Sequence, residues 1–149
     1  MRLRYVVIVS FIVLGLGASL AMGAAPHKVI GSDKCKLCHK VEFASWSTTK
    51  HAKAWDSLKP AEQSKPDCVK CHSTDGTKAM PGVGCEACHG PGSDYKTMAI
   101  MKDKQKAHAA GLIEPTEAVC VKCHNKQSPT FKGFNFAEAV KNVHDKKKK

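Results

Sequence analysis

Hydrophobic and polar positions divide the chain into one apolar segment near its start and several short stretches with helical spacing. Residues 5–16 are almost continuously apolar, follow Arg2 and Arg4, and lead into mostly small residues. This layout is typical of a secretory signal peptide, and the apolar run is short for a membrane-spanning helix. We therefore expect residues 1–25 to be removed on export, and residues 26–149 to form one domain without a stable membrane anchor.

Residues 41–58 contain few helix-breaking residues and repeat ring-bearing side chains at spacings of roughly three to four. Phe43, His51 and Trp55 fall on this repeat, which is the spacing of one helix face. We expect a single amphipathic helix over this segment, with His51 on its apolar side.

Residues 135–144 have the same spacing. Asn135 is the predicted N-cap, and Glu138 stands three residues later as its capping partner. His144 shares one helix face with apolar residues. These residues are Phe136, Val140 and Val143.

Residues 98–110 form a further predicted helix, which ends before Gly111 in the C′ position. Met101 and His108 lie on one face of it, so both are placed to reach the same neighbouring group.

Composition changes this picture, because such helices have too few large side chains to pack a deep core. The 149 residues include only 5 Phe, 2 Trp and 2 Tyr, but 8 Cys and 8 His. A small domain of this kind depends on disulfides, metals or a bulky cofactor for its stability.

The charge is strongly positive, with a formal net value of +11 that becomes +9 after the predicted cleavage. Lys carries all of the remaining positive charge, and nucleic-acid recognition relies heavily on Arg. The composition therefore argues against a nucleic-acid partner. We expect residues 146–149, all Lys, to form a flexible tail.

The cysteines form the most specific pattern in the chain. They fall into four Cys-x-x-Cys pairs, each followed at once by His. The pairs are Cys35/Cys38, Cys68/Cys71, Cys85/Cys88 and Cys120/Cys123, followed by His39, His72, His89 and His124. Cys-x-x-Cys-His is the attachment signature of a c-type haem. The two thiols form thioethers to one porphyrin edge, and the next residue's imidazole ligates the iron.

Zinc binding, redox dithiols and structural disulfides are the alternatives for such pairs. None of them requires His directly after every pair, and haem attachment is expected on the exported side of the membrane. We therefore expect four covalently bound c-type haems. Their porphyrins take the place of a hydrophobic core. Their propionates offset part of the Lys excess, so the net charge alone does not require an acidic partner.

Four histidines remain outside the motifs, which is as many as there are expected haems. They are His27, His51, His108 and His144. His51 and His144 lie on predicted apolar helix faces, where porphyrin is the expected neighbour. His108 competes with Met101 for one iron. His27 lies in a segment without periodicity, so one haem has either His27 or no protein group as its sixth ligand.

Spacing also restricts the arrangement of the motifs. Twelve residues separate His72 from Cys85, and Gly and Pro mark turns among them. The second and third haems are therefore expected to lie near each other.

Several blocks around the motifs resemble a known family and cover most of the chain after residue 25. They are Cys35-Lys-Leu-Cys-His39 with Trp46, His51-Ala-Lys-Ala54 and Leu58-Lys-Pro60; Cys68-Val-Lys-Cys-His72; Gly82-Val-Gly-Cys-Glu-Ala-Cys-His-Gly-Pro-Gly92; and Cys120-Val-Lys-Cys-His124 with Phe134-Asn-Phe136 before His144. Together they resemble the tetrahaem cytochrome c-554 family, and the block that ends at Gly92 is the most specific. The resemblance implies a fold of helix and coil, with haems in closely stacked pairs.

The resemblance also implies sixth ligands for two haems. It implies that His51 ligates the third haem, bound at His89. It implies that His144 ligates the fourth haem, bound at His124.

The first and second haems are less closely defined by the resemblance. The family places a His for the first haem shortly after the Gly-Pro-Gly block. The only candidate here is His108, nineteen residues past His89, which leaves Met101 open. The second haem, at His72, is five-coordinate in the family's type member, so here it is either capped by His27 or open.

The sequence thus predicts a mainly α fold with much coil, organised around four haems, in a periplasmic or extracellular protein. The expected function is electron transfer between redox partner proteins by haem-to-haem hopping, without catalysis. Reduction of a small nitrogen or oxygen species at an open haem is one alternative. A subunit of an extracellular haem-chain assembly is the other. No motif identifies the donor, the acceptor or the oligomeric state.

Overall fold

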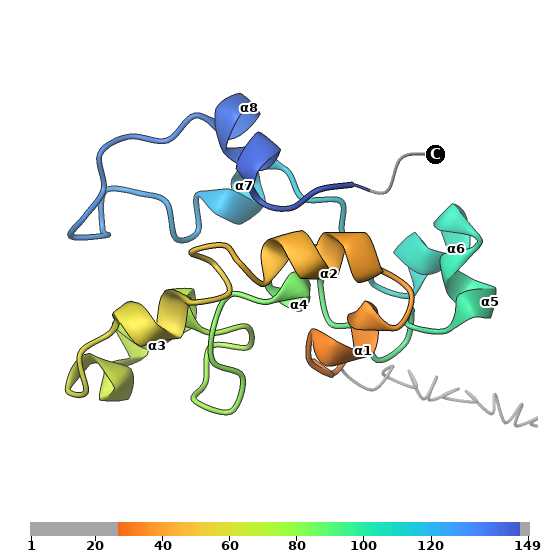
Figure 1. Cartoon of the computed structure of the whole chain (residues 1–149), viewed down its shortest axis with the longest axis horizontal. Helices are drawn as coiled ribbons and strands as arrows, with labels where there is room; N and C mark the ends of the chain where they lie inside the picture. Colours follow the sequence, from red (N-terminus) through yellow and green to blue (C-terminus); the bar gives the residue numbers. More distant parts are fainter. Residues whose placement is uncertain (1–26, 147–149) are drawn as a thin grey trace, which may run out of the picture.

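The computed structural model describes residues 27–146. In this range the chain forms short helices joined by turns and coil (Figure 1), and its only β-pairing is a single bridge between Ser73 and Pro81. This confirms the predicted mainly α fold with much coil. The predicted signal peptide and residues 147–149 of the predicted Lys tail lie outside the described residues.

The helices are all short. The α-helices are α1 (Asp33–Lys36), α2 (Lys40–Trp46), α3 (Pro66–His72), α4 (Cys85–His89), α5 (Met98–Met101), α6 (Lys104–Ala109), α7 (Glu117–Cys120) and α8 (Phe136–Ala139). The 3-10 helices are η1 (Ala54–Ser57), η2 (Glu62–Ser64) and η3 (Val140–Asn142). Helices that are neighbours along the chain pack together, such as α1 with α2 and α5 with α6. Figure 1 shows α3 at one end of the molecule and α5 and α6 at the other.

The prediction of one helix over residues 41–58 is wrong, because α2 ends at Trp46. Hydroxyl groups of the residues that follow donate hydrogen bonds back to carbonyl groups of the last helical turn. These residues are Ser47, Thr48 and Thr49. Such bonds offer the backbone an alternative to the helix. His51 therefore lies in a turn between α2 and η1, and not on a helix face.

The prediction of one helix over residues 98–110 is also wrong, because the segment is divided into α5 and α6. The Asp103 side chain accepts a hydrogen bond from the Lys106 backbone N–H and so forms an N-cap for α6. Met101 and His108 consequently lie on different helices. Gly111, with φ of +98°, follows α6 and confirms the predicted C′ position.

The third predicted helix begins as expected. The Asn135 side chain accepts a hydrogen bond from the Glu138 backbone N–H, which confirms the N-cap. The Glu138 carboxylate does not complete the predicted capping box, because it binds Lys141 at 2.8 Å. The helix tightens into η3 before His144.

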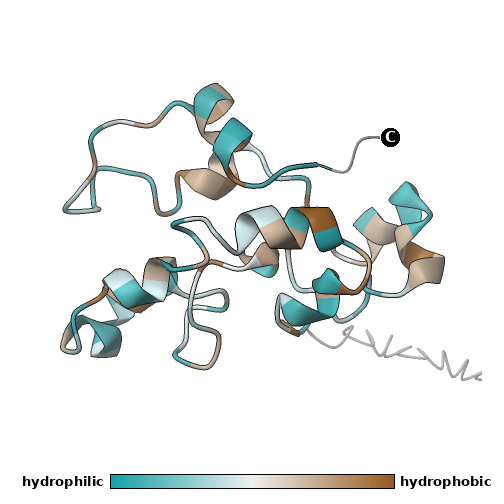
Figure 2. Ribbon diagram, in the orientation of Figure 1, coloured by the Kyte–Doolittle hydropathy of each residue, from teal (hydrophilic) through white to brown (hydrophobic). Residues whose placement is uncertain are grey.

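The polypeptide contributes little core of its own. Within residues 27–146, the buried apolar side chains are Leu58, Val69, Tyr95 and Ala107. Figure 2 shows hydrophobic positions scattered among hydrophilic ones along the ribbon. No helix in this part of the chain combines the length and the apolar character needed to cross a membrane. So small an apolar core agrees with the expectation that a bulky cofactor stabilises the domain.

Candidate functional site

The four Cys-x-x-Cys-His motifs share one local geometry. Helices α3 and α4 end on His72 and His89. In the other two motifs, the backbone N–H of the His donates to the carbonyl of the first Cys at 2.9 Å. One helical turn places residues i, i+3 and i+4 on the same side. Each motif therefore directs two sulfurs and one imidazole to one side of the backbone.

Backbone carbonyls orient the rings of two motif histidines. Nδ1 of His72 lies 2.7 Å from the Ala54 carbonyl oxygen, and Nδ1 of His89 lies 3.1 Å from that of Ile113. A carbonyl can only accept a hydrogen bond, so Nδ1 carries the proton. The lone pair of Nε2 is then free to bind a metal.

Two of the remaining histidines are oriented in the same way. Nδ1 of His108 lies 2.9 Å from the Leu112 carbonyl oxygen, and Nδ1 of His144 lies 2.7 Å from that of Asp145. His144 therefore has Nε2 available as a ligand, whereas Nε2 of His108 lies 3.8 Å from Glu114 Oε1.

Two candidate sixth ligands lie opposite motif histidines, in the reverse of the expected order. The ring centroids of His51 and His124 are 5.8 Å apart, and those of His89 and His144 are 6.3 Å apart. Two imidazoles on opposite faces of one iron have centroids about 6 Å apart, because each metal–nitrogen bond is about 2 Å long. In this structure His51 thus lies opposite His124 and His144 opposite His89, whereas the resemblance implied His51 for the haem at His89 and His144 for the haem at His124.

Contacts far from α2 in sequence fix the position of His51. The His51 carbonyl accepts a hydrogen bond from Val83 N–H at 2.9 Å, and the Trp46 indole donates to the Val83 carbonyl at 3.0 Å. Gly82 allows this close approach, because a Cβ there would lie 2.6 Å from the Ala52 carbonyl oxygen. These contacts hold the turn that carries His51 against the segment leading into α4.

Burial favours the neutral form of one ring in each pair. Burial, assisted by nearby His124, holds the pKa of His51 below its usual value, and burial does the same to the pKa of His89. The neutral imidazole is the form that binds iron. The environment of both rings thus favours ligation.

His27 does not lie near the second motif. Its Nδ1 is 2.5 Å from Asp94 Oδ2, and its Nε2 lies against Gly111, which follows α6. His72 ends α3, at the opposite end of the molecule (Figure 1). Of the two expectations for the haem at His72, a cap from His27 and an open iron, this position favours the open iron.

Contacts between cysteines of different motifs give the order of the motifs in space. A hydrogen bond between the thiols of Cys35 and Cys85 raises the pKa of Cys35 and lowers the pKa of Cys85. Burial raises the pKa of Cys88, and nearby Cys120 raises it further. The first motif is therefore next to the third, and the third is next to the fourth.

Cys71 and Cys123 form a disulfide, with their Cα atoms 5.5 Å apart. This differs from the expectation that all eight cysteines attach haem, because one sulfur forms either a disulfide or a thioether. The bond arises because two neighbouring attachment turns bring one sulfur of each within reach. It places the second motif beside the fourth, so the spatial order is first, third, fourth, second.

The second and third motifs are also close, as the short connection predicts. The backbone N–H of Gly82, three residues before Cys85, donates to the His72 carbonyl at 3.0 Å. The loop between the motifs therefore folds back on itself.

Glu86 is a site residue that the sequence argument did not single out. It lies between the cysteines of the third motif and is only 4% exposed. Its carboxylate accepts hydrogen bonds from the backbone N–H groups of Ile30, Gly31 and Gly92 at 2.9, 2.7 and 2.6 Å. It thus ties the start of the domain to the loop after α4. The available signal was that no other motif has an acid between its cysteines.

The donor groups fit four haems. Each motif provides two sulfurs and one imidazole on one side of a turn, and two motifs have a second imidazole at the spacing of a shared iron. Within residues 27–146, no three Cys, His, Asp or Glu side chains converge on a position for a single metal ion.

Comparisons with known proteins agree with this geometry. Residues 34–90 match the family model "Cytochrome c554 and c-prime". Cytochrome c-554 of Nitrosomonas europaea is 37% identical over an alignment 156 positions long, which covers 78% of this chain. The chain spans 65% of the length of that curated relative.

A solved structure has a similar fold. The reduced state of cytochrome c554 from Nitrosomonas europaea superposes with a TM-score of 0.61 at 28% identity. The match covers 80% of this chain and 85% of the other. The similarity therefore extends from the motifs to the path of the backbone.

Replacing Glu86 by Gln tests its role in the third motif. The side-chain amide of Gln places an N–H group opposite backbone N–H groups, so at least one hydrogen bond of Glu86 is lost. A buried hydrogen bond to a charged group contributes about 1.5–3 kcal/mol to the free energy of unfolding. We expect the Tm of the haem-loaded protein to fall by about 5–10 °C. Glu117→Gln changes the same charge at an exposed position in α7 and should leave Tm unchanged. Equal Tm values for both variants and the parent, measured by circular dichroism, would contradict this role.

Proposed function

Because the chain belongs to the cytochrome c-554 family, we propose that it is an exported electron carrier with four covalently bound c-type haems. The observation that carries the proposal is the repeated turn that directs two sulfurs and one imidazole to the same side. The thioether residues are Cys35, Cys38, Cys68, Cys71, Cys85, Cys88, Cys120 and Cys123. The axial residues of the motifs are His39, His72, His89 and His124.

The contacts between motifs support a relay. Haem supplies one-electron chemistry when bound, and electrons hop between neighbouring haems. The protein sets the neighbours, because it brings Cys35 to Cys85 and Cys88 to Cys120. In the haem-loaded protein, Cys71 and Cys123 carry thioethers in place of their disulfide. The relay then runs through the first, third, fourth and second motifs, with the first and second at its ends.

Axial ligands follow from the ring positions. His51 ligates the iron held by His124, and His144 ligates the iron held by His89, as their ring spacings support. His108 is the sixth ligand of the first haem, with Met101 as the alternative. The oriented ring of His108 favours it. Two imidazoles on an iron give a lower potential than His with Met.

The proposed location is the periplasm or the cell exterior, after removal of residues 1–25. The apolar run behind a basic start supports this location. The exchanging partners are redox proteins, and the chain itself performs no catalysis in this role.

Potentiometric titration of the haem-loaded protein tests this function. We expect four one-electron reductions per chain. His51→Met should raise the potential of one haem, by on the order of 0.1 V, because thioether ligation favours the reduced iron. His27→Met is the matched control and should change no potential, because His27 binds Asp94. Fewer than four one-electron reductions in the parent protein would contradict the proposed function as a four-haem electron carrier. Four unchanged potentials in His51→Met would contradict the assigned ligand.

A second candidate function is the binding and reduction of a small nitrogen or oxygen species at the second haem. The position of His27 favours it, because His27 lies against Gly111, which follows α6. Helix α3, which ends at His72, lies at the other end of the molecule from α6 (Figure 1). The imidazoles of His51 and His144 lie beside other motif histidines. The second haem is then five-coordinate and open to a small ligand.

Electron paramagnetic resonance of the ferric protein, quantified per iron, tests the open haem. We expect about one iron in four to be high-spin, because only a missing or weak sixth ligand leaves a haem high-spin. Added azide should convert this iron to low-spin. Four low-spin irons before any addition would remove the site at which a reductase would act.

A further inference from the structure

The two ends of the proposed relay differ in charge. The segment 33–53 around the first motif contains five Lys and two acidic residues, whereas the segment 54–78 around the second motif contains four of each. Of the two ends of the proposed relay, the first motif therefore carries an excess of positive charge and the second motif carries none.

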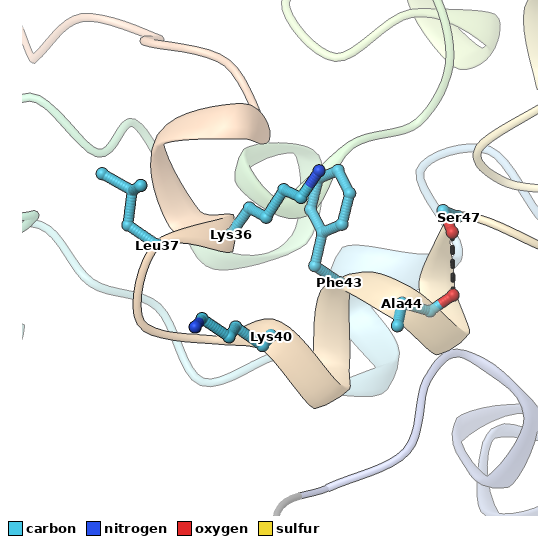
Figure 3. A pocket seen from close by; sticks show the side chains of 6 residues that line it. All are labelled: Lys36, Leu37, Lys40, Phe43, Ala44 and Ser47. Carbon is cyan, nitrogen blue, oxygen red and sulfur yellow. Dashed lines mark hydrogen bonds between the residues drawn. The ribbon is translucent and has the colours of Figure 1, made fainter.

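A hollow with an apolar floor lies within this positive region. Its volume is about 550 Å³, and α2 and the turn before it form its walls. Figure 3 shows its lining residues, which are Lys36, Leu37, Lys40, Phe43, Ala44 and Ser47. Leu37 is 76% exposed, although it lies between the two cysteines of the motif. An exposed apolar side chain within a ring of charge is a common feature of protein interfaces.

The ammonium groups beside this hollow are available to a partner. Lys36 Nζ lies 5.1 Å from the centroid of the Phe43 ring, which holds the charge over the apolar floor. Among the described residues, neither Lys36 nor Lys40 forms an ion pair. Both side chains are exposed.

The corresponding positions of the second motif lack these features. Val69 follows the first cysteine of its motif, as Lys36 does in the first motif, and it is only 5% exposed. Lys70 binds Asp67 at 2.7 Å, so its charge is already compensated. Of the two positions between the cysteines, the second motif therefore has one buried and one ion-paired, whereas both are exposed at the first motif.

We propose that the hollow formed by Lys36, Leu37, Lys40 and Phe43 is the docking site for an acidic redox protein. Carboxylates of the partner bind the two ammonium groups, and an apolar side chain of the partner contacts Leu37 and Phe43. Cys38, next to Leu37, joins the first haem to this surface, so docking brings the partner's redox centre to the end of the relay. Complementary charge accelerates such encounters. This inference rests on the proposed electron-carrier function.

Charge reversal in the haem-loaded protein tests the site, with flavodoxin as an acidic redox probe. We expect Lys36→Glu/Lys40→Glu to weaken binding of oxidised flavodoxin at low ionic strength by about tenfold, as measured by calorimetry. The electron-transfer rate from reduced flavodoxin should fall by a similar factor. Lys65→Glu/Lys70→Glu makes the same change in net charge around the second motif and should reduce both quantities less than threefold.

Equal losses in the two double variants would overturn the site, because only net charge would then matter. Unchanged binding in Lys36→Glu/Lys40→Glu would also overturn it. Carbodiimide cross-linking adds a readout that does not depend on redox activity, and we expect flavodoxin carboxylates to be joined to Lys36 or Lys40. The four potentials of both variants serve as a separate control. Loss of haem or of redox activity in the parent protein would count against the proposed function and not against the docking site.

Discussion

The attachment of a porphyrin edge to two sulfurs, with an imidazole directly after them, is the constraint on which the rest of this structure depends. It requires one helical turn at each of four places, because only that turn directs residues i, i+3 and i+4 to the same side. Helices α3 and α4 contain the whole of the second and third motifs, and a single turn continues α1 and α7 through the first and fourth. The remaining residues connect these turns and include the candidate sixth ligands.

This constraint explains why so little of the polypeptide is buried. Four haems are expected to fill the interior. Most inward-facing side chains then contact a haem, and few side chains need to pack against each other. Specific polar contacts define the backbone path. Glu86 binds three backbone N–H groups, two from the distant residues Ile30 and Gly31 and one from nearby Gly92. The Val83 N–H donates to the His51 carbonyl, and the Val83 carbonyl accepts from the Trp46 indole. These two bonds fix the position of the turn that carries His51, which lies outside any helix.

Features that depend on a few neighbouring residues could be predicted from the sequence. The motif turns, the Asn135 N-cap and the Gly111 C′ position are all local, and the structure has them. The long helices were wrong, since periodicity alone does not reveal that Thr49 and Asp103 form hydrogen bonds that end or restart a helix.

The pairing of His51 and His144 could not be predicted from the same information. It depends on where separate turns lie in space, and the family resemblance implied the other order. The position of His27 likewise depends on Asp94, sixty-seven residues away. Glu86 was visible as the only acid between two motif cysteines, but its role follows from contacts with residues on both sides of the domain.

Diffraction from crystals of the haem-loaded protein at the iron absorption edge tests the central claim most directly, because it locates each iron. The account predicts four irons, one between His51 and His124 and one between His89 and His144, in the spatial order first, third, fourth, second. An iron shared by His51 and His89, or fewer than four irons in a fully loaded chain, would contradict it.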